Sequence, residues 1–303
     1  MTQHMPKRIV MNDLGGVLCV DKPLGITSHD VVNRIRRTAS LRRVGHAGTL
    51  DPLATGVLLL CLGRSTRLIE YLVGHDKVYE TTVRLGQTTS TYDAEGEVVA
   101  ERPFRHLTLN QIQDALEPFR GDIQQQPPLY SAIKQGGQPL YKLARQGKAD
   151  VERPFRPVTI HELTLLKWDP PHLSLRVHCS SGTYIRSLGH DLGEALRCGG
   201  HLTALRRLAV GDFTVETAVP LTTLSPENIA HYLLPPDTAV RHLPRVDLLE
   251  TAAADILQGK PIPQTDSIST ELARAYGPDN QFLGIITASD GQWLSRKMFP
   301  AVP

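Results

Sequence analysis

Hydrophobic positions along the chain form two patterns that predict β-strands. Residues 57–62 are continuously apolar, and a run of this length and composition is typical of a strand that is buried on both faces. Within residues 172–179 apolar and polar side chains alternate, which is the pattern of a half-buried strand. The same reasoning predicts further strands at residues 16–20, 77–85, 159–168 and 282–287.

Apolar side chains spaced by three and four residues predict helices. One such helix follows Thr27 or Ser28, either of which can cap it, and its far end runs into a cluster of arginines. The expected starts of the other main helices are Ser65, Thr108, Thr183 and Leu249. A glycine-rich basic segment at about 124–150 is predicted to form a clamp, with a short helix near residues 139–146.

Prolines mark a change of organisation after about residue 220. They punctuate residues 221–244, which are therefore expected to form a linker. The remaining residues offer one helix and several strand-like pieces, so the pattern predicts a small, mostly β second domain at 245–303.

Directly before the apolar run at 57–62 lies a loop with a single carboxylate, Asp51. Residues 45–56 read GHAGTLDPLATG and consist mainly of glycine, proline and small side chains. A carboxylate on a tight loop at the edge of a rigid sheet is a candidate catalytic group. An Asp-Pro pair also occurs in ordinary turns, where the aspartate caps its own backbone, so this loop alone leaves both interpretations open.

Composition narrows the class of protein. The chain has 303 residues, of which 41% are hydrophobic, enough for about two domains of ~150 residues. No apolar run approaches the ~18 residues of a membrane span, and the polar N-terminus lacks a signal-peptide pattern, so we expect a cytoplasmic location.

The four cysteines form no CxxC pair and are predicted to be reduced and buried. We see no HExxH or Cys/His motif and predict no metal.

Charge is informative only through its distribution, because the net charge is +2. Residues 34–43 carry five arginines and no acid, residues 134–148 carry four basic side chains and no acid, and Arg206 and Arg207 form a third basic spot. A single patch of this kind is usually a solvated face. Three of them favour a polyanionic partner such as RNA.

Arg186 stands in the first turn of a predicted helix, where the helix dipole disfavours a cation, and a partner acid would explain its position. A carboxylate such as Asp51 can act as a nucleophile when an arginine keeps it ionised and oriented. An aromatic ring can stack on a base that has been flipped out of an RNA loop. The structural alternatives stay open for residues that can equally be packing, turn or solvated side chains: Tyr79, Tyr184, His46 and Lys22.

Five segments together resemble the TruB family, the pseudouridine synthases that form pseudouridine-55 in the T-loop of tRNA. In chain order they are GVLCVDKPLGITSHDVV, GHAGTLDPLATGVLLLCLG, YSAIKQGGQPLYKLARQG, VHCSSGTYIRSLGHDLGEAL and GHLTALRRL. They cover nearly all of residues 16–215.

The resemblance implies an α+β pseudouridine synthase fold, with a central, mostly antiparallel mixed sheet and a small C-terminal PUA-like β domain. The implied organisation is an N-terminal tail at 1–15, a catalytic domain at 16–220, a linker at 221–244 and the PUA-like domain at 245–303. Residues 130–148 match the bacterial thumb insertion, here placed at about 124–150, which argues against a guide-RNA-dependent relative.

Three catalytic positions carry over from the family residue by residue. Asp51 matches the nucleophile, Tyr79 the tyrosine that stacks on the target base, and Arg186 the arginine that pairs with the catalytic acid. Four substrate-binding positions carry over in the same way. Tyr184 and Leu205 match residues of the uridine pocket, His46 a histidine that helps the T-loop unfold its bases, and Lys22 a pocket lysine with a more structural role.

The implied activity is that of an isomerase, tRNA pseudouridine(55) synthase, which flips a uridine out, cleaves its N-glycosidic bond and rejoins the uracil through C5. An isomerisation requires no cofactor and no metal. The implied partner is the T-stem-loop of tRNA, and we expect a monomer without membrane contact. Attack by Asp51 at C1′, removal of the C2′ proton and attack at uracil C6 all stay open.

Two other functions compete with this prediction. One is a non-catalytic RNA-binding protein or tRNA-folding chaperone, which the basic patches would serve equally well. The other is a phosphotransferase with an aspartyl-phosphate, which the sequence disfavours because Leu53 stands where a second acid would be needed.

Overall fold

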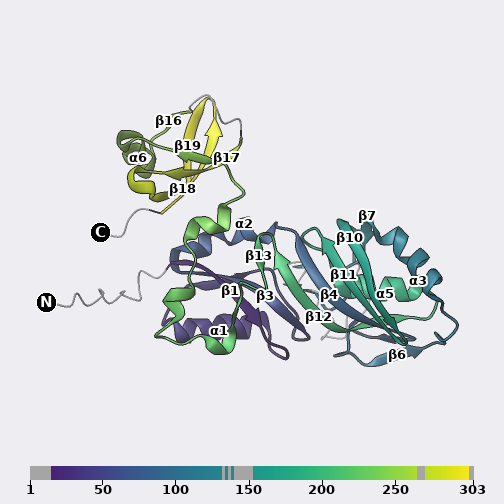
Figure 1. Cartoon of the computed structure of the whole chain (residues 1–303). Helices are drawn as coiled ribbons and strands as arrows, with labels where there is room; N and C mark the ends of the chain where they lie inside the picture. The colour runs from purple at the N-terminus through teal and green to yellow at the C-terminus, as the bar shows by residue number, and fades with distance from the viewer. Residues whose placement is uncertain (1–14, 132–133, 136–137, 140–152, 265–269, 300–303) are drawn as a thin grey trace.

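The computed structural model describes residues 15–131, 134–135, 138–139, 153–264 and 270–299. A large twisted sheet with flanking helices forms the main part, and a smaller β domain follows at the C-terminus (Figure 1). The short helix predicted near 139–146, and most of the predicted clamp, lie outside the described residues.

The large sheet is mixed and mostly antiparallel, as predicted. Its strands run in the order β14, β1, β3, β12, β4, β11, β10, β7, with β2 beside β3 and β13 beside β12. Only the pairs β1–β14 and β3–β12 are parallel among these neighbours. The strands span β1 Gly16–Lys22, β2 Val44–Ala47, β3 Ala54–Leu62, β4 Lys77–Leu85, β7 Gly121–Gln125, β10 Arg156–Asp169, β11 His172–Cys179, β12 Gly200–Val210, β13 Phe213–Thr214 and β14 Val219–Pro220.

Two of the predicted helix caps are confirmed. Thr27 caps α1 (Ser28–Thr38) and Thr108 caps α3 (Leu109–Leu116), each in a capping box that satisfies free backbone N–H groups. A short 3₁₀ helix, η3 (Glu117–Phe119), extends α3.

Two other helix starts were wrong. Ser65 lies inside a 3₁₀ helix, η2 (Gly63–Leu68), and caps nothing; α2 (Ile69–Val73) follows it. The helix expected from Thr183 begins later, as α5 (Ile185–Ala195) with Tyr184 at the cap position, and it ends before Gly199. The Thr183 hydroxyl instead donates to the carbonyl of Ser180 and stabilises the preceding turn.

The core lies on both faces of the large sheet. One buried cluster joins α1, α3 and α5 to one face, with Leu58, Leu60 and Val83 among its members. A second cluster covers the other face of β1 and β3 and includes Ile285 and Phe299 of the C-terminal domain. The continuous apolar run of β3 is thus explained, since side chains of both faces are buried.

The predicted linker at 221–244 is packed against the large sheet. It forms short 3₁₀ helices, η4 (Leu221–Thr223), η5 (Ile229–Tyr232) and η6 (Pro236–Val240), and Ile229 and Val240 are fully buried. Leu234 exchanges backbone hydrogen bonds with Val17 of β1. Residues 221–244 therefore pack on the large sheet, although their prolines predicted only a linker between domains.

A five-stranded sheet forms the C-terminal domain, which confirms the prediction of a mostly β domain. Its order is β15, β17, β18, β19, β16, and α6 (Glu250–Leu257) packs with it around the buried Trp293. The strands are β15 Arg245–Asp247, β16 Ile262–Pro263, β17 Leu272–Tyr276, β18 Phe282–Ser289 and β19 Gln292–Met298. No helix among the described residues is long and apolar enough to cross a membrane.

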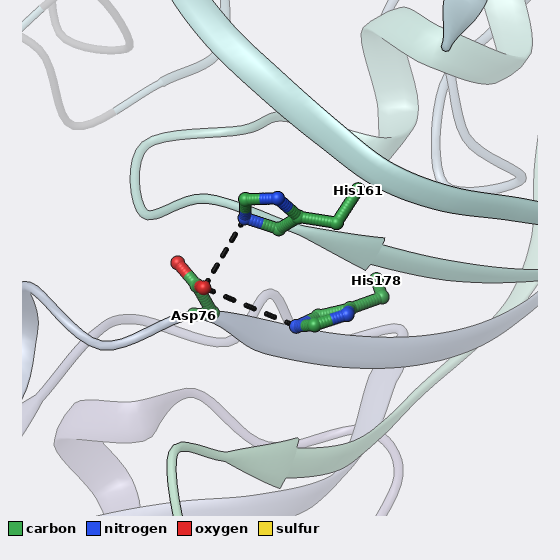
Figure 2. Close-up of side chains that lie close together, drawn as sticks. All are labelled: Asp76, His161 and His178. Atoms are coloured by element: carbon green, nitrogen blue, oxygen red, sulfur yellow. Dashed lines mark ion pairs between the residues drawn. The ribbon is translucent and has the colours of Figure 1, made fainter. Parts of the chain in front are cut away.

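Polar side chains gather at two places around the large sheet. A small hairpin of β5 (Gln87–Thr89) and β6 (Val98–Glu101) holds a polar turn between its strands. On the exposed face of the large sheet, Asp76, His161 and His178 lie close together (Figure 2). All four cysteines are free and buried, as predicted.

Candidate active site

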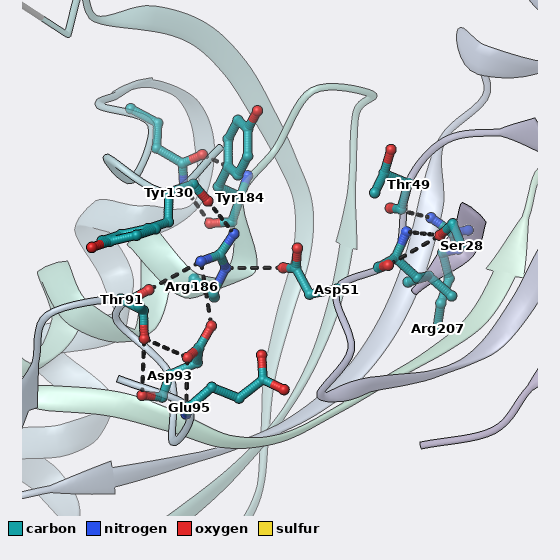
Figure 3. A network of polar contacts seen from close by, with 12 residues as sticks. Ser28, Thr49, Asp51, Thr91, Asp93, Glu95, Tyr130, Tyr184, Arg186 and Arg207 are labelled. Carbon is teal, nitrogen blue, oxygen red and sulfur yellow. Dashed lines mark hydrogen bonds and ion pairs between the residues drawn. The ribbon is translucent and has the colours of Figure 1, made fainter. Parts of the chain in front are cut away.

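The centre of the site is the guanidinium of Arg186, on the first turn of α5 (Figure 3). Its Nε lies 2.9 Å from Oδ2 of Asp51, and its Nη1 lies 3.3 Å from Oδ2 of Asp93. The exposed fractions of these side chains are 7% for Arg186, 3% for Asp93 and 35% for Asp51. One buried cation therefore joins a buried carboxylate to one that solvent can reach.

Backbone carbonyls complete the surroundings of this guanidinium. Nη1 donates to the carbonyl of Thr91 at 3.1 Å, and Nη2 donates to the carbonyl of Tyr130 at 2.8 Å. Because these acceptors lie on separate segments, the plane of the guanidinium is fixed in orientation. The partner acid expected from the placement of Arg186 at a helix start is confirmed, and the structure adds a second one.

Asp93 is the site residue that sequence reasoning missed. It lies in the turn between β5 and β6, where its Oδ1 accepts hydrogen bonds from the Thr91 hydroxyl at 2.5 Å and the Glu95 backbone N–H at 3.1 Å. Its backbone forms a bridge with Leu202 of β12, which anchors the turn to the large sheet. The local signal was the polar run around residues 89–95, which is also typical of an ordinary turn.

The loop that carries Asp51 connects β2 to β3 and is fixed from two sides. Arg207 of β12 donates to the carbonyls of Val57, Gly48 and Thr49, at 2.7, 3.1 and 3.5 Å. From the other side, Ser28 of α1 pairs with both backbone groups of Leu50, at 2.8 and 3.0 Å. The backbone just before Asp51 is therefore held by buried polar contacts.

These contacts correct one prediction. The basic spot at Arg206 and Arg207 is not a free surface for a polyanion, since Arg207 is 1% exposed and Arg206 forms a two-pronged pair with Asp21, at 2.8 and 3.1 Å. Of the patch at 34–43, four arginines are exposed, two within α1 and two after it: Arg34, Arg37, Arg42 and Arg43. The side chains of the patch at 134–148 lie outside the described residues except for Gln138.

Lys22 contacts the Asp51 loop on the C-terminal side of Asp51, at Pro52. Its fully buried ammonium donates to the carbonyls of Ile26 at 2.7 Å, Pro23 at 2.9 Å and Pro52 at 3.5 Å. Burial lowers the pKa of this amine to about 8, and the nearby charge of Asp51 opposes that shift. These contacts hold the peptides on either side of the Asp51 loop, and the role of Lys22 in a substrate pocket stays a prediction.

The electrostatics of Asp51 combine two opposing influences. Burial raises the pKa of its carboxyl above the ordinary value, and the charge of Arg186 opposes that rise. The charge of Asp93 acts with burial, since two carboxylates near one another disfavour joint ionisation. Arg186 is thus the main group that favours the ionised form of Asp51, and the charge of Lys22 acts in the same direction.

Tyr79 and Leu205 lie on the adjacent strands β4 and β12, where Tyr79 pairs with Arg207 and Leu205 with Thr81. Both side chains are nearly buried. Burial raises the pKa of the Tyr79 phenol, which keeps it neutral, while the charge of Arg207 opposes the rise. On the other side of β12, Leu205 and Arg207 pair with Ala54 and Gly56 at the start of β3, directly after the Asp51 loop, so both strands lie beside that loop.

Tyr184 and His46 are placed by different local contacts. The backbone of Tyr184 is held by the side-chain amide of the buried Gln125, which accepts from its N–H at 2.7 Å and donates to its carbonyl at 3.0 Å. Burial also raises the pKa of the Tyr184 phenol. His46, on β2, has a lowered pKa because of burial, and its Nδ1 has no hydrogen-bond partner among the described residues.

Comparison with known proteins decides the family. A model of the "TruB family pseudouridylate synthase (N terminal domain)" matches residues 36–185, and two C-terminal models of the same enzymes match 186–241 and 244–296. The chain belongs to the TruB family of pseudouridylate synthases. The predictions of this family and of an isomerase of the pseudouridine synthase class are therefore confirmed.

Curated relatives cover nearly the whole chain. A tRNA pseudouridine synthase B from Yersinia pestis (strain Pestoides F) is 44% identical over 302 residues, covering 94% of this chain and 92% of the relative. The protein of the same name from Coxiella burnetii (strain Dugway 5J108-111) is 43% identical over 292 residues, with 94% of each chain covered.

Solved structures confirm the predicted pseudouridine synthase fold. A chain of a Cbf5-Nop10-Gar1 complex has a TM-score of 0.68 and 28% identity, covering 90% of this chain and 78% of that one. A chain of an H/ACA RNP bound to a substrate RNA containing 2′-deoxyuridine has a TM-score of 0.73 at 24% identity, covering 97% and 88%. The latter likeness concerns the fold alone.

Replacement of Arg186 by methionine is expected to change the pH dependence of turnover. Loss of the guanidinium removes the influence that lowers the pKa of Asp51, so this pKa rises further. If turnover needs the carboxylate, activity is lost as pH falls through that pKa. The acidic limb of the pH–rate profile therefore moves to higher pH. The measurement is the single-turnover rate against pH. The matched control is Arg176→Met, on the exposed face where Arg176 pairs with Glu80, which should leave the limb in place.

Asp93→Asn is expected to slow turnover without weakening RNA binding. The amide keeps the shape of the side chain but loses the charged contact with Arg186, which is worth about 1.5–3 kcal/mol, or a rate loss of about 10- to 150-fold. Single-turnover rates and tRNA affinity are measured together. An unchanged rate, with the variant folded, would show that Asp93 does not position Arg186.

Proposed function

We propose that this chain converts uridine 55 in the T-loop of tRNA to pseudouridine, with Asp51 as the catalytic carboxylate. The observation that carries the proposal is the ion pair between the partly exposed Asp51 and the buried Arg186. The loop that carries Asp51 is itself held by Arg207 and Ser28. The names of the curated relatives support tRNA as the substrate.

The reaction is an isomerisation in which all atoms of the uridine are retained except one exchanged proton. The bond between N1 of uracil and C1′ of ribose breaks, the uracil rotates, and a new bond forms between C5 and C1′. The proton on C5 leaves to solvent, and N1 takes up a proton. Asp51 acts at the ribose, either by attack on C1′ or by removal of a C2′ proton, and Arg186 keeps it ionised and oriented.

The remaining site residues bind the flipped nucleotide. Tyr79, whose phenol stays neutral, stacks on the target base, and Tyr184 and Leu205 enclose the uracil. His46, which is partly exposed on β2, contacts the opened T-loop, and Lys22 maintains the shape of the loop around Asp51.

The basic surface and the domain boundaries complete the proposal. The four exposed arginines after and within α1 contact phosphates of the tRNA. Residues 16–220 act as the catalytic domain, residues 221–244 connect it, and residues 245–303 form the PUA-like domain. Action as a monomer in the cytoplasm stays a prediction.

Tritium release tests this function. Unmodified tRNA labelled with [5-³H]uridine is incubated in EDTA with the wild type or Asp51→Asn, beside a tRNA whose uridine 55 is replaced by cytidine. The wild type should release tritium from the normal tRNA only, because C5–H is lost only when C5 becomes the point of attachment. Asp51→Asn should bind tRNA and release none.

Three results would contradict the proposal in different ways. Release from the cytidine-55 tRNA would reject the position. Release by Asp51→Asn above a trace would reject the catalytic carboxylate. Binding of tRNA without release by the wild type would favour the chaperone interpretation.

A further inference from the structure

A second group of chemically active side chains lies outside the proposed active site (Figure 2). Oδ2 of Asp76 lies 3.1 Å from Nε2 of His161 and 3.9 Å from Nε2 of His178. The two imidazole rings have centroids 4.8 Å apart. Each of the three residues offers one possible ligand atom, and these atoms all lie within 4.8 Å of one another.

Three adjacent strands bring these residues together. Asp76 immediately precedes β4, His178 lies in β11 and His161 lies in β10, in the sheet order β4, β11, β10. The pairing of β10 with β11 shifts between Ile160 and Glu162, so His161 is the extra residue of a β-bulge. A bulge redirects the side chain that it carries, and here the ring of His161 is placed above the same carboxylate as that of His178.

The group faces away from the proposed active site. His178 stands between Val177 and Cys179, which are both fully buried, so its side chain emerges on the opposite, solvent-facing side of the sheet. Tyr79 faces the buried side from β4. Ligand binding at the three residues therefore requires no contact with Asp51 or Arg186.

The geometry is close to that of a divalent metal site. Zinc binds imidazole nitrogen and carboxylate oxygen at about 2.0–2.2 Å, which places neighbouring ligand atoms of a tetrahedral site about 3.3 Å apart. The two distances from Asp76 lie on either side of that value. A bound ion would draw the three ligand atoms, now within 4.8 Å of one another, closer by rotation of side chains that are each more than a third exposed, and water would take the fourth position.

Neighbouring charged groups do not occupy this space. The Lys77 ammonium donates to the carbonyls of Val73 and His75, and Arg176 is paired with Glu80 on the same face. We infer that Asp76, His161 and His178 bind one divalent cation of the zinc class, which ties β10, β11 and β4 together at the exposed end of the sheet. Its ligands are spread over about a hundred residues of sequence, so no local spacing could reveal it, and the prediction of no metal is revised for this surface.

Zinc binding to the full chain without an affinity tag tests this inference. Metal-free protein is titrated with Zn²⁺ against a chromophoric chelator, and its thermal unfolding is followed with and without Zn²⁺. The wild type should bind one ion at the site and unfold at a higher temperature when it is present. His161→Ala and His178→Ala should weaken this binding by more than about tenfold, since even indirect changes around a metal cost 10–100-fold.

His172→Ala provides the matched control, because His172 is an exposed histidine on the same face of β11. It should bind zinc as the wild type does. Affinity of the wild type should fall as pH is lowered, because a protonated imidazole cannot coordinate a metal. Co²⁺ in place of Zn²⁺ should give the intense visible absorption of a tetrahedral site, and Asp76→Asn should diminish it.

Two outcomes would overturn the inference. One is wild-type binding no tighter than that of His161→Ala. Another is loss of binding in His242→Ala, whose ring lies 4.8 Å from that of His75, since that pair would then be the zinc site. Circular dichroism verifies that each variant is folded. Tritium release in EDTA measures the proposed function separately, and it should be the same for wild type and His161→Ala.

Discussion

The buried guanidinium of Arg186 is the group on which the rest of the site depends. A buried charge is tolerated only when it is paired and hydrogen-bonded, and breaking one partner of such a pair typically costs about 3–5 kcal/mol. Asp93 and the carbonyls of Thr91 and Tyr130 meet this requirement from the interior. Asp51 completes the pairing from the solvent side, so it is held in place and still accessible.

This arrangement assigns different tasks to two similar acids. Asp93 is buried and bound by the Thr91 hydroxyl and the Glu95 N–H, so it serves as a fixed countercharge. Asp51 projects from a loop whose neighbouring peptides are held by Arg207, Ser28 and Lys22. The loop leaves Asp51 little freedom to move, so the position of the carboxylate that we propose to react is set before substrate binds.

The close approach of β3 to β12 makes the Arg207 contacts possible. Gly56 has a φ of +101°, and a Cβ at this position would lie 2.1 Å from the carbonyl oxygen of Arg207. Only glycine combines this backbone conformation with such a short distance between strands. Gly56, near the start of β3, therefore brings the supporting arginine within reach of Gly48 and Thr49 in the Asp51 loop.

Local patterns predicted the strands well, because alternation and continuous apolar runs report burial directly, as in β3, β4 and β11. Helix starts were less predictable. The Thr183 hydroxyl bonds to the carbonyl of Ser180, and Ser65 lies inside a 3₁₀ helix, and a cap motif reveals neither outcome. The resemblance supplied Asp51, Arg186 and Tyr79. Asp93, the burial of Arg207 and the group around Asp76 depend on contacts between distant strands, which one sequence does not encode locally.

A double-mutant cycle on the single-turnover rate of pseudouridine formation tests the central role of Arg186 most directly. Rates are measured for the wild type, Asp93→Asn, Arg186→Met and the double variant, with saturating enzyme. If Asp93 acts only through Arg186, the double variant is as slow as Arg186→Met alone, because the countercharge has nothing left to position. If the two rate losses multiply, Asp93 and Arg186 act independently, and Arg186 is not the group through which the buried acid supports Asp51.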